Sequence, residues 1–168
     1  MGILITYQKD KGVSFNDILL LWGIDRNKTR TLLNDNYEIS DKVIDLSQYH
    51  DGNNYHNIIQ RRDIYKNYQQ QDNFFFLNFD LNDRLTEIEI HHGLDINIEN
   101  IPIDFSMDIE DVIKILSNIS NDKRKLSEGE YFFKDLKLTV ASSEAMGGDG
   151  NELSYFYCSK DITHLTDK

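Results

Sequence analysis

The stretch Asn73–Ile90, with the sequence NFFFLNFDLNDRLTEIEI, decides the fold class of this chain. It begins with the aromatic-rich run Phe74–Phe79 and passes through a short polar turn at Asn82 and Asp83. The following segment, residues 85–90, alternates along the chain, which is the period of a strand with one buried face. Two strand-like runs around a short polar turn predict a β-hairpin.

The alternation also predicts which side chains share a face of the hairpin. Two sets fall on opposite faces, namely Thr86, Ile88 and Ile90 on one and Leu85, Glu87 and Glu89 on the other. Further strands are predicted at Ile3–Tyr7, around Lys42–Leu46, along a sheet edge at Ile96–Pro102, at Tyr131–Val140 and at Leu153–Cys158. The polar or glycine-rich segments Gln48–Asn57, Asn121–Glu130 and Gly147–Gly150 are predicted to be loops or connectors.

Two short helices are predicted where a polar residue precedes an apolar run. Ser14 and Asp17 have a spacing like that of a capping box ahead of Ile18–Trp22, and Gly23 supplies a stop. Asp108 is expected to cap a second helix over Ile109–Leu116. The two helix starts resemble each other in sequence, which leaves a weak internal repeat open.

The pattern as a whole predicts an α+β fold in a single globular domain over residues 1–168. A mostly antiparallel sheet of six or more strands would carry the two short helices on one face. Residues 25–73 give no clear pattern and leave room for one more helix.

The charge balance is strongly acidic. Lys and Arg number 18 against 29 Asp and Glu, a formal net charge of -11. Such a surface repels nucleic acid and anionic membranes and attracts cationic partners. The basic clusters Arg61–Arg62 and Lys123–Lys125 are too short to favour nucleic-acid binding on so acidic a chain.

Cysteine content and hydropathy bear on the compartment. The single cysteine, Cys158, excludes an intrachain disulfide and fits a reducing environment. No signal sequence opens the chain, and no apolar run approaches the roughly 18 residues of a membrane-spanning helix. We therefore expect a soluble, cytoplasmic protein that has neither nucleic acid nor a membrane as partner.

Three groups of residues are candidates for a metal site, a phosphate-binding loop and a nucleophile. Each group also has a purely structural interpretation. Glu87, Glu89, His91 and His92 form the best candidate for a metal site, although the same pattern describes a solvated strand face. Residues 147–150 lack the Gly-Lys-Ser/Thr ending of a phosphate-binding loop. Cys158 could pair with His164 or His50 as nucleophile and base, but its strand-like surroundings favour a buried, inert thiol. We expect no metal, no cofactor and no catalytic residue.

The acidic residues Asp108, Glu110 and Asp111 gather at the second predicted helix start. Compensation of the helix dipole explains them without a function. The functional interpretation is an acidic patch that receives Lys or Arg from a partner, and both interpretations stay open.

The acidic single domain, the short helix DVIKIL at residues 111–116, the aromatic hairpin Phe74–Ile90 and the Asn-rich loops together resemble the small immunity proteins of bacterial polymorphic toxins. These include the immunity proteins of contact-dependent growth inhibition systems. The resemblance covers the chain only in general character and carries no residue over by position. It implies a cytoplasmic protein that binds one cognate toxin domain, often a basic nuclease, and blocks its active site or the approach of its substrate.

Charge and expected exposure give the residues for contact with such a partner: Glu87, Glu89, Asp95, Glu99, Asp104, Asp108, Glu110 and Asp111, with Tyr155 and Tyr157 as aromatic anchors. Two other classes remain. One is a non-catalytic accessory or assembly protein of a mobile element. The other is a metal-assisted hydrolase that uses Glu87, Glu89, His91 and His92.

Overall fold

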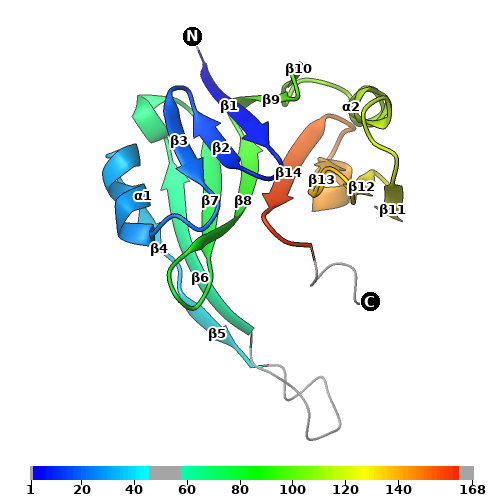
Figure 1. The fold of residues 1–168 in the computed structure, drawn as a ribbon. Helices are drawn as coiled ribbons and strands as arrows, with labels where there is room; N and C mark the ends of the chain where they lie inside the picture. The colour runs from blue at the N-terminus through cyan, green and yellow to red at the C-terminus, as the bar shows by residue number, and fades with distance from the viewer. Residues whose placement is uncertain (1, 46–57, 163–168) are drawn as a thin grey trace, which may run out of the picture.

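The strands form two sheets that pack face to face in the computed structural model, which describes residues 2–45 and 58–162 (Figure 1). The smaller sheet has the order β10-β9-β1-β2-β3 and consists of β1 (Ile3–Gln8), β2 (Gly12–Phe15), β3 (Ile18–Leu21), β9 (Leu94–Ile98) and β10 (Ile101–Ile103). The larger sheet has the order β11-β12-β13-β14-β8-β7-β6-β4, and β5 also pairs with β6.

The strands of the larger sheet are β4 (Glu38–Ile39), β5 (Lys42–Ile44), β6 (Ile58–Lys66), β7 (Phe74–Phe79), β8 (Leu85–His92), β11 (Lys123–Ser127), β12 (Glu130–Phe133), β13 (Leu138–Ser142) and β14 (Leu153–Ser159). Among the described strands, β1 and β9 form a parallel pair and the other pairs are antiparallel. The predicted α+β class with mostly antiparallel sheets is confirmed, although the strands divide between two sheets.

The core lies between the two sheets. Phe15 of the smaller sheet packs on Phe75 of the larger, with ring centroids 4.9 Å apart. The buried hydroxyl of Tyr7 donates to the backbone carbonyl of Leu136 at 2.7 Å, which ties β1 to the turn before β13. Each fully buried apolar side chain of this size stabilises the fold by about 1.5–3 kcal/mol.

The chain passes from one sheet to the other at Gly93, between β8 and β9. Gly93 has a φ of +79°, and a Cβ atom there would lie 1.9 Å from the backbone oxygen of Asp72. Only glycine fits so close an approach in this conformation. Gly93 therefore lets the hairpin strand β8 lead directly into the second sheet.

The hairpin predicted from residues 74–90 is present as β7 and β8, with one difference in side-chain direction. The register shifts between Asn78 and Phe79, so that Phe79 faces Leu85. As a result Leu85 is buried with Ile88 in the core, whereas the alternation placed Leu85 on the face of Glu87. A β-bulge adds one residue to a strand and reverses the alternation beyond it.

The first predicted helix is wrong, because residues 12–21 form the hairpin of β2 and β3. Asn16 sits in the turn with a φ of +51°, a conformation that Asn tolerates and that tight hairpin turns require. The apolar run is too short to form a stable helix by itself, and it pairs with β2 as the strand β3 instead. The second predicted helix is confirmed as α2 (Ile109–Ser117), capped by Asp108. The proposed repeat therefore fails, since its two members adopt different structures.

Residues 25–73, which show no clear sequence pattern, contain the helix α1 (Arg26–Leu33). Asp25 caps it and accepts hydrogen bonds from the backbone N–H of Asn27 at 2.9 Å and of Lys28 at 3.2 Å. Its sequence, RNKTRTLL, has too few apolar residues to show a helical period. In space, α1 contacts β3 of the smaller sheet, whereas α2 contacts β13 of the larger sheet.

The other predicted strands are present with altered bounds, but the segment predicted along a sheet edge at Ile96–Pro102 divides into the interior strand β9 and the edge strand β10. Residues 131–140 divide into β12 and β13, and the predicted connector Asn121–Glu130 contains the exposed strand β11. The 3-10 turn η3 (Glu144–Met146) and the glycine-rich segment connect β13 to β14, and a second 3-10 turn, η2 (Tyr68–Gln70), precedes β7. The loop predicted at Gln48–Asn57 lies outside the described residues. Among the described residues, no helix is long and apolar enough to cross a membrane.

Candidate functional site: a carboxylate and tyrosine pocket

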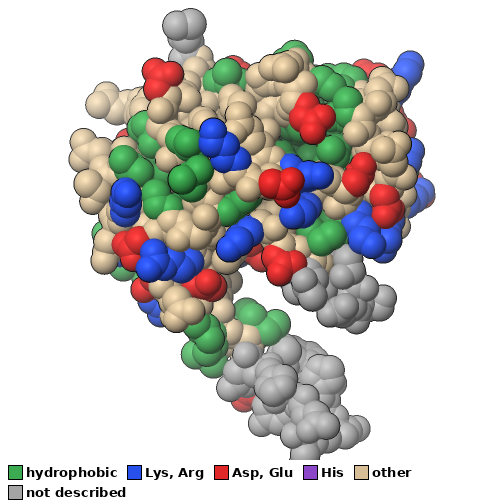
Figure 2. All heavy atoms as spheres, viewed as in Figure 1, with side chains coloured by type: hydrophobic (Ala, Val, Ile, Leu, Met, Phe, Trp, Pro, Cys, Tyr) green, Lys and Arg blue, Asp and Glu red, His purple; other side chains and the backbone are tan. Residues whose placement is uncertain are grey.

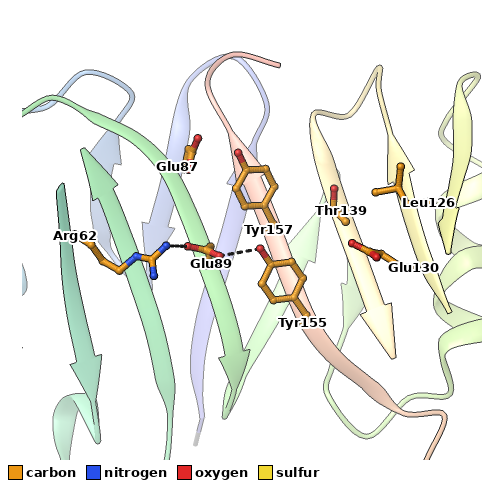
Figure 3. A pocket seen from close by; sticks show the side chains of 8 residues that line it. All are labelled: Arg62, Glu87, Glu89, Leu126, Glu130, Thr139, Tyr155 and Tyr157. Atoms are coloured by element: carbon orange, nitrogen blue, oxygen red, sulfur yellow. Dashed lines mark hydrogen bonds and ion pairs between the residues drawn. The ribbon is translucent and has the colours of Figure 1, made fainter. Parts of the chain in front are cut away.

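The outer face of the larger sheet, turned away from the core, carries an open pocket of about 350 Å³ (Figure 3). Eight side chains from β6, β8, β12, β13, β14 and the exposed strand β11 line it: Arg62, Glu87, Glu89, Leu126, Glu130, Thr139, Tyr155 and Tyr157. We call this the outer-face pocket. Strand alternation brings Glu87 and Glu89 of β8 beside Tyr155 and Tyr157 of β14.

Glu89 is the centre of the hydrogen-bond network in this pocket. One of its carboxylate oxygens accepts a hydrogen bond from the Tyr155 hydroxyl at 2.8 Å. The other accepts from Nη2 of Arg62 at 2.7 Å and from the side-chain amide of Asn78 at 2.8 Å. Arg62 in turn donates from Nε to Asn78 at 2.7 Å and lies over the Phe76 ring at 4.5 Å. These contacts fix the Glu89 carboxylate within the sheet.

The two tyrosines stay protonated and act as hydrogen-bond donors. Burial raises the pKa of Tyr155, and the neighbouring Glu89 carboxylate raises it further. Burial likewise raises the pKa of Tyr157, followed by the effect of Glu87. The two phenol rings stack with centroids 6.5 Å apart and an angle of 11° between their planes. The pocket therefore has an aromatic wall whose polar ends point at carboxylates.

The lining of the pocket has an excess of negative charge. Three carboxylates, on Glu87, Glu89 and Glu130, line the pocket together with one guanidinium, on Arg62, so the formal charge of the lining is negative. Such a pocket suits an ammonium or guanidinium group. The tyrosine rings can also attract a cation through their faces, and Leu126 can cover an aliphatic stem.

An aromatic strip continues from the pocket across β7 and β8. His91 lies 4.6 Å from the Phe76 ring and 5.5 Å from the Tyr155 ring, measured between centroids. Burial lowers the pKa of His91, so the ring is neutral at neutral pH. Its Nε2 atom has no hydrogen-bond partner among the described residues. His91 is therefore part of this aromatic strip beside the pocket.

The structure brings together four of the ten residues predicted to bind a partner, namely Glu87, Glu89, Tyr155 and Tyr157. The other six lie along the segment from β9 to α2: Asp95, Glu99, Asp104, Asp108, Glu110 and Asp111. Two of these six have structural contacts. Asp108 caps α2, and hydrogen bonds from Ser106 lower the pKa of Asp104. Asp95, Glu99, Glu110 and Asp111 are exposed.

Sequence reasoning missed Arg62, Leu126, Glu130 and Thr139 as lining residues. Their positions depend on strand order, since they come from β6, β12, β13 and the neighbouring strand β11. The one available signal was the period of two within each strand, which does not say which strands are neighbours.

The four residues considered as a candidate metal site do not converge. Glu87, Glu89 and His91 share the outer face, but Glu89 is engaged by Arg62, Asn78 and Tyr155. His92 lies 3.0 Å from Asp72 instead. Across residues 2–45 and 58–162, no group of three or more His, Cys, Asp or Glu side chains is arranged to hold a metal ion.

Cys158 is buried in the core, and burial raises the pKa of its thiol. A protonated, enclosed thiol is a poor nucleophile. The two histidines considered as its base, His50 and His164, lie outside the described residues. The described surroundings of Cys158 therefore fit the packing role expected from the sequence.

Comparison of the chain with protein-family models, with curated proteins and with solved structures gives no match. The geometry and charge of the outer-face pocket are therefore the observations that bear on function.

Proposed function

We propose that this chain is a binding protein that neutralises a basic protein partner in the cytoplasm, as immunity proteins neutralise toxin domains. The observation that carries the proposal is the outer-face pocket, in which three carboxylates and one guanidinium lie beside two tyrosine rings. A Lys or Arg side chain of the partner would enter the pocket, with its cation at the carboxylates and its stem against Tyr155 and Leu126.

The charge of the whole chain supports the same kind of partner. With a formal net charge of -11, the protein attracts a basic surface over a long range and increases the rate of encounter. Nucleases are basic where they hold phosphate, so an acidic inhibitor pairs with the surface that binds the substrate. The pocket then supplies the close contact that fixes the complex.

The test is a binding titration with the product of the gene that adjoins the one for this chain. We expect a nanomolar complex that weakens as salt increases and that removes the toxic or nuclease activity of the partner. The informative variant is the double substitution Glu87→Gln and Glu130→Gln, which removes two pocket charges and keeps the Glu89–Arg62 pair. We expect it to bind about 10- to 100-fold more weakly, the effect of roughly 1.4–2.8 kcal/mol.

The matched control is Asp17→Asn with Asp149→Asn, two exposed acids away from the pocket with the same change in net charge. The control should bind within about threefold of the original chain. Equal losses in both variants would show that only net charge matters and would overturn the role of the pocket. A complex that leaves the partner's activity intact would favour the accessory-protein class.

A further inference from the structure

An apolar groove lies between the edge strand β3 and the helix α1, well apart from the outer-face pocket in composition and position. Two neighbouring depressions of about 510 Å³ and 460 Å³ share Leu21 and Trp22 and so form one continuous surface. Leu21 is 46% exposed and Leu32 of α1 is 39% exposed. Figure 2 shows apolar side chains gathered over β3 and α1, with Lys and Arg side chains beside them.

The rim of this groove is basic on an acidic protein. Five cationic side chains line the two depressions, namely Lys11, Lys28, Arg84, Lys137 and Lys160, against the carboxylates of Asp10 and Asp25. Both carboxylates already have partners within the protein. Asp10 pairs with Lys137 at 3.2 Å, and Asp25 caps α1.

The other four cations, Lys11, Lys28, Arg84 and Lys160, make no side-chain ion pair with any residue in the described part of the chain. Lys28 and Arg84 line one depression, and Lys11 and Lys160 line the other. A ligand that lies along the groove would therefore meet positive charge at both ends and apolar surface in the middle.

The backbone of β3 adds hydrogen-bonding capacity. β3 is the last strand of the smaller sheet and, among the described strands, pairs with β2 only. In a hairpin closed by a two-residue turn, Phe15 and Ile18 exchange hydrogen bonds, so the N–H and C=O groups of Leu19 point away from β2. An edge of this kind can accept an extended segment of another chain.

We infer that the groove binds an extended protein segment with aliphatic side chains at its centre and carboxylates on both sides. The aliphatic side chains would contact Leu21, Trp22 and Leu32, and the carboxylates would pair with the four unpaired cations. This second surface is independent of the proposed function, since it selects an acidic segment while the outer-face pocket selects a cation. The protein would then hold two partners, or two parts of one partner, of opposite charge.

Trp22 is the single tryptophan of the chain, so its fluorescence reports this groove alone. The probe is a synthetic peptide of alternating Leu and Glu, blocked at both ends. Two matched peptides carry Lys in place of Glu, or Ser in place of Leu. We expect the Leu/Glu peptide to give a saturable shift of Trp22 emission that weakens in salt, with at least tenfold weaker binding of each matched peptide.

Two variants place the interaction. The double substitution Lys28→Gln and Arg84→Gln should weaken binding of the Leu/Glu peptide about tenfold, and Leu21→Ser should weaken it by a similar factor. Both changes are at the surface, and circular dichroism verifies that the fold is kept. The pocket variant Glu87→Gln with Glu130→Gln should bind the peptide as the original chain does, which separates the two proposals.

Three outcomes would overturn the inference. The Leu/Glu peptide could leave Trp22 emission unchanged up to millimolar concentration. The Leu/Lys peptide could bind as tightly as the Leu/Glu peptide. Alternatively, Trp22 emission could shift with protein concentration in the absence of peptide, together with dimer formation in sedimentation, which would assign the groove to a second copy of the chain.

Discussion

Two neighbouring residues of β6, Arg62 and Asp63, belong to ion networks on opposite faces of the larger sheet. Asp63 faces inward, is fully buried and binds Arg26 at 2.6 Å and Arg30 at 2.7 Å. Arg62 faces outward and binds Glu89 in the outer-face pocket. The two networks use the same kinds of group, yet their charge balance differs.

The inward network is balanced. It joins three aspartates and three arginines, namely Asp41, Asp63, Asp83, Arg26, Arg30 and Arg61. The outer-face pocket has three carboxylates and one arginine. The balanced network fixes α1 on β6, whereas the lining of the outer-face pocket has more carboxylates than cations, which is the basis of the proposed binding role. The difference suggests that charge balance, more than the presence of ion pairs, separates structural from binding clusters in this protein.

The largest expected effect comes from breaking the inward network with Asp63→Asn. Arg26 is only 4% exposed, so removal of its buried partner leaves a guanidinium without full compensation. We expect a loss of about 3–5 kcal/mol in the free energy of unfolding, measured by urea denaturation. Asp17→Asn, an exposed control, should change it by less than about 0.5 kcal/mol. A loss below 1 kcal/mol for Asp63→Asn would mean that α1 is held mainly by other contacts.

An intermediate effect is expected from Glu89→Gln in the pocket. Glu89 and Arg62 are 14% and 22% exposed, so the lost charged hydrogen bonds should cost about 1.5 kcal/mol, the lower end of the usual range. Glu130→Gln, whose carboxylate accepts a hydrogen bond from the Ser127 hydroxyl at 3.0 Å, should cost less than about 0.5 kcal/mol. Urea denaturation of the two variants tests the order. Equal losses would contradict the central place of Glu89.

Acidification should weaken the inward network next. The hydrogen bond from Arg26 lowers the pKa of Asp41 below its ordinary value of 3.8. Because the folded pKa is the lower one, the contribution of Asp41 is fully present above the unfolded pKa and is lost as pH falls through the folded pKa. The melting temperature should therefore fall more steeply below pH 4 in the original chain than in Asp41→Asn. Parallel curves would show that Asp41 contributes nothing to acid sensitivity.

The smallest effect concerns His91 on the aromatic strip. Burial lowers its pKa below 6.5, so its contribution to stability is present above that value and is lost as pH falls through the folded pKa. His91→Phe should flatten the change in stability between pH 7 and pH 5, measured by urea denaturation. Proton NMR titration of the ring gives the pKa directly. A His91 pKa above 6.5 would contradict the burial argument.

The elements that sequence patterns predicted correctly are those whose stability is local. The hairpin of β7 and β8 has a clear turn and a period of two, and α2 has a cap and an apolar face. The structure of residues 12–33 was not predictable in this way. Ile18–Leu21 is a strand because β2 lies beside it, and α1 is a helix because Asp63 receives its arginines.

In the candidate site, too, some residues could be predicted from local patterns and others depend on contacts between distant strands. Glu87, Glu89, Tyr155 and Tyr157 could be chosen from charge, aromatic character and alternation within their own strands. Arg62 and Glu130 could not, because their proximity depends on strand order across the larger sheet. The inward direction of Leu85 depends on a bulge that no residue pattern in the hairpin marks.

The most direct test of the account is an NMR titration of the outer-face pocket with N-acetyl-arginine amide, compared with its neutral analogue N-acetyl-citrulline amide. We predict saturable shifts of the Tyr155 and Tyr157 ring signals with the arginine probe, weakened by salt and by the double substitution Glu87→Gln and Glu130→Gln. The citrulline probe should leave these signals in place. Equal shifts with both probes, or none with either, would contradict the claim that this pocket receives a cationic side chain.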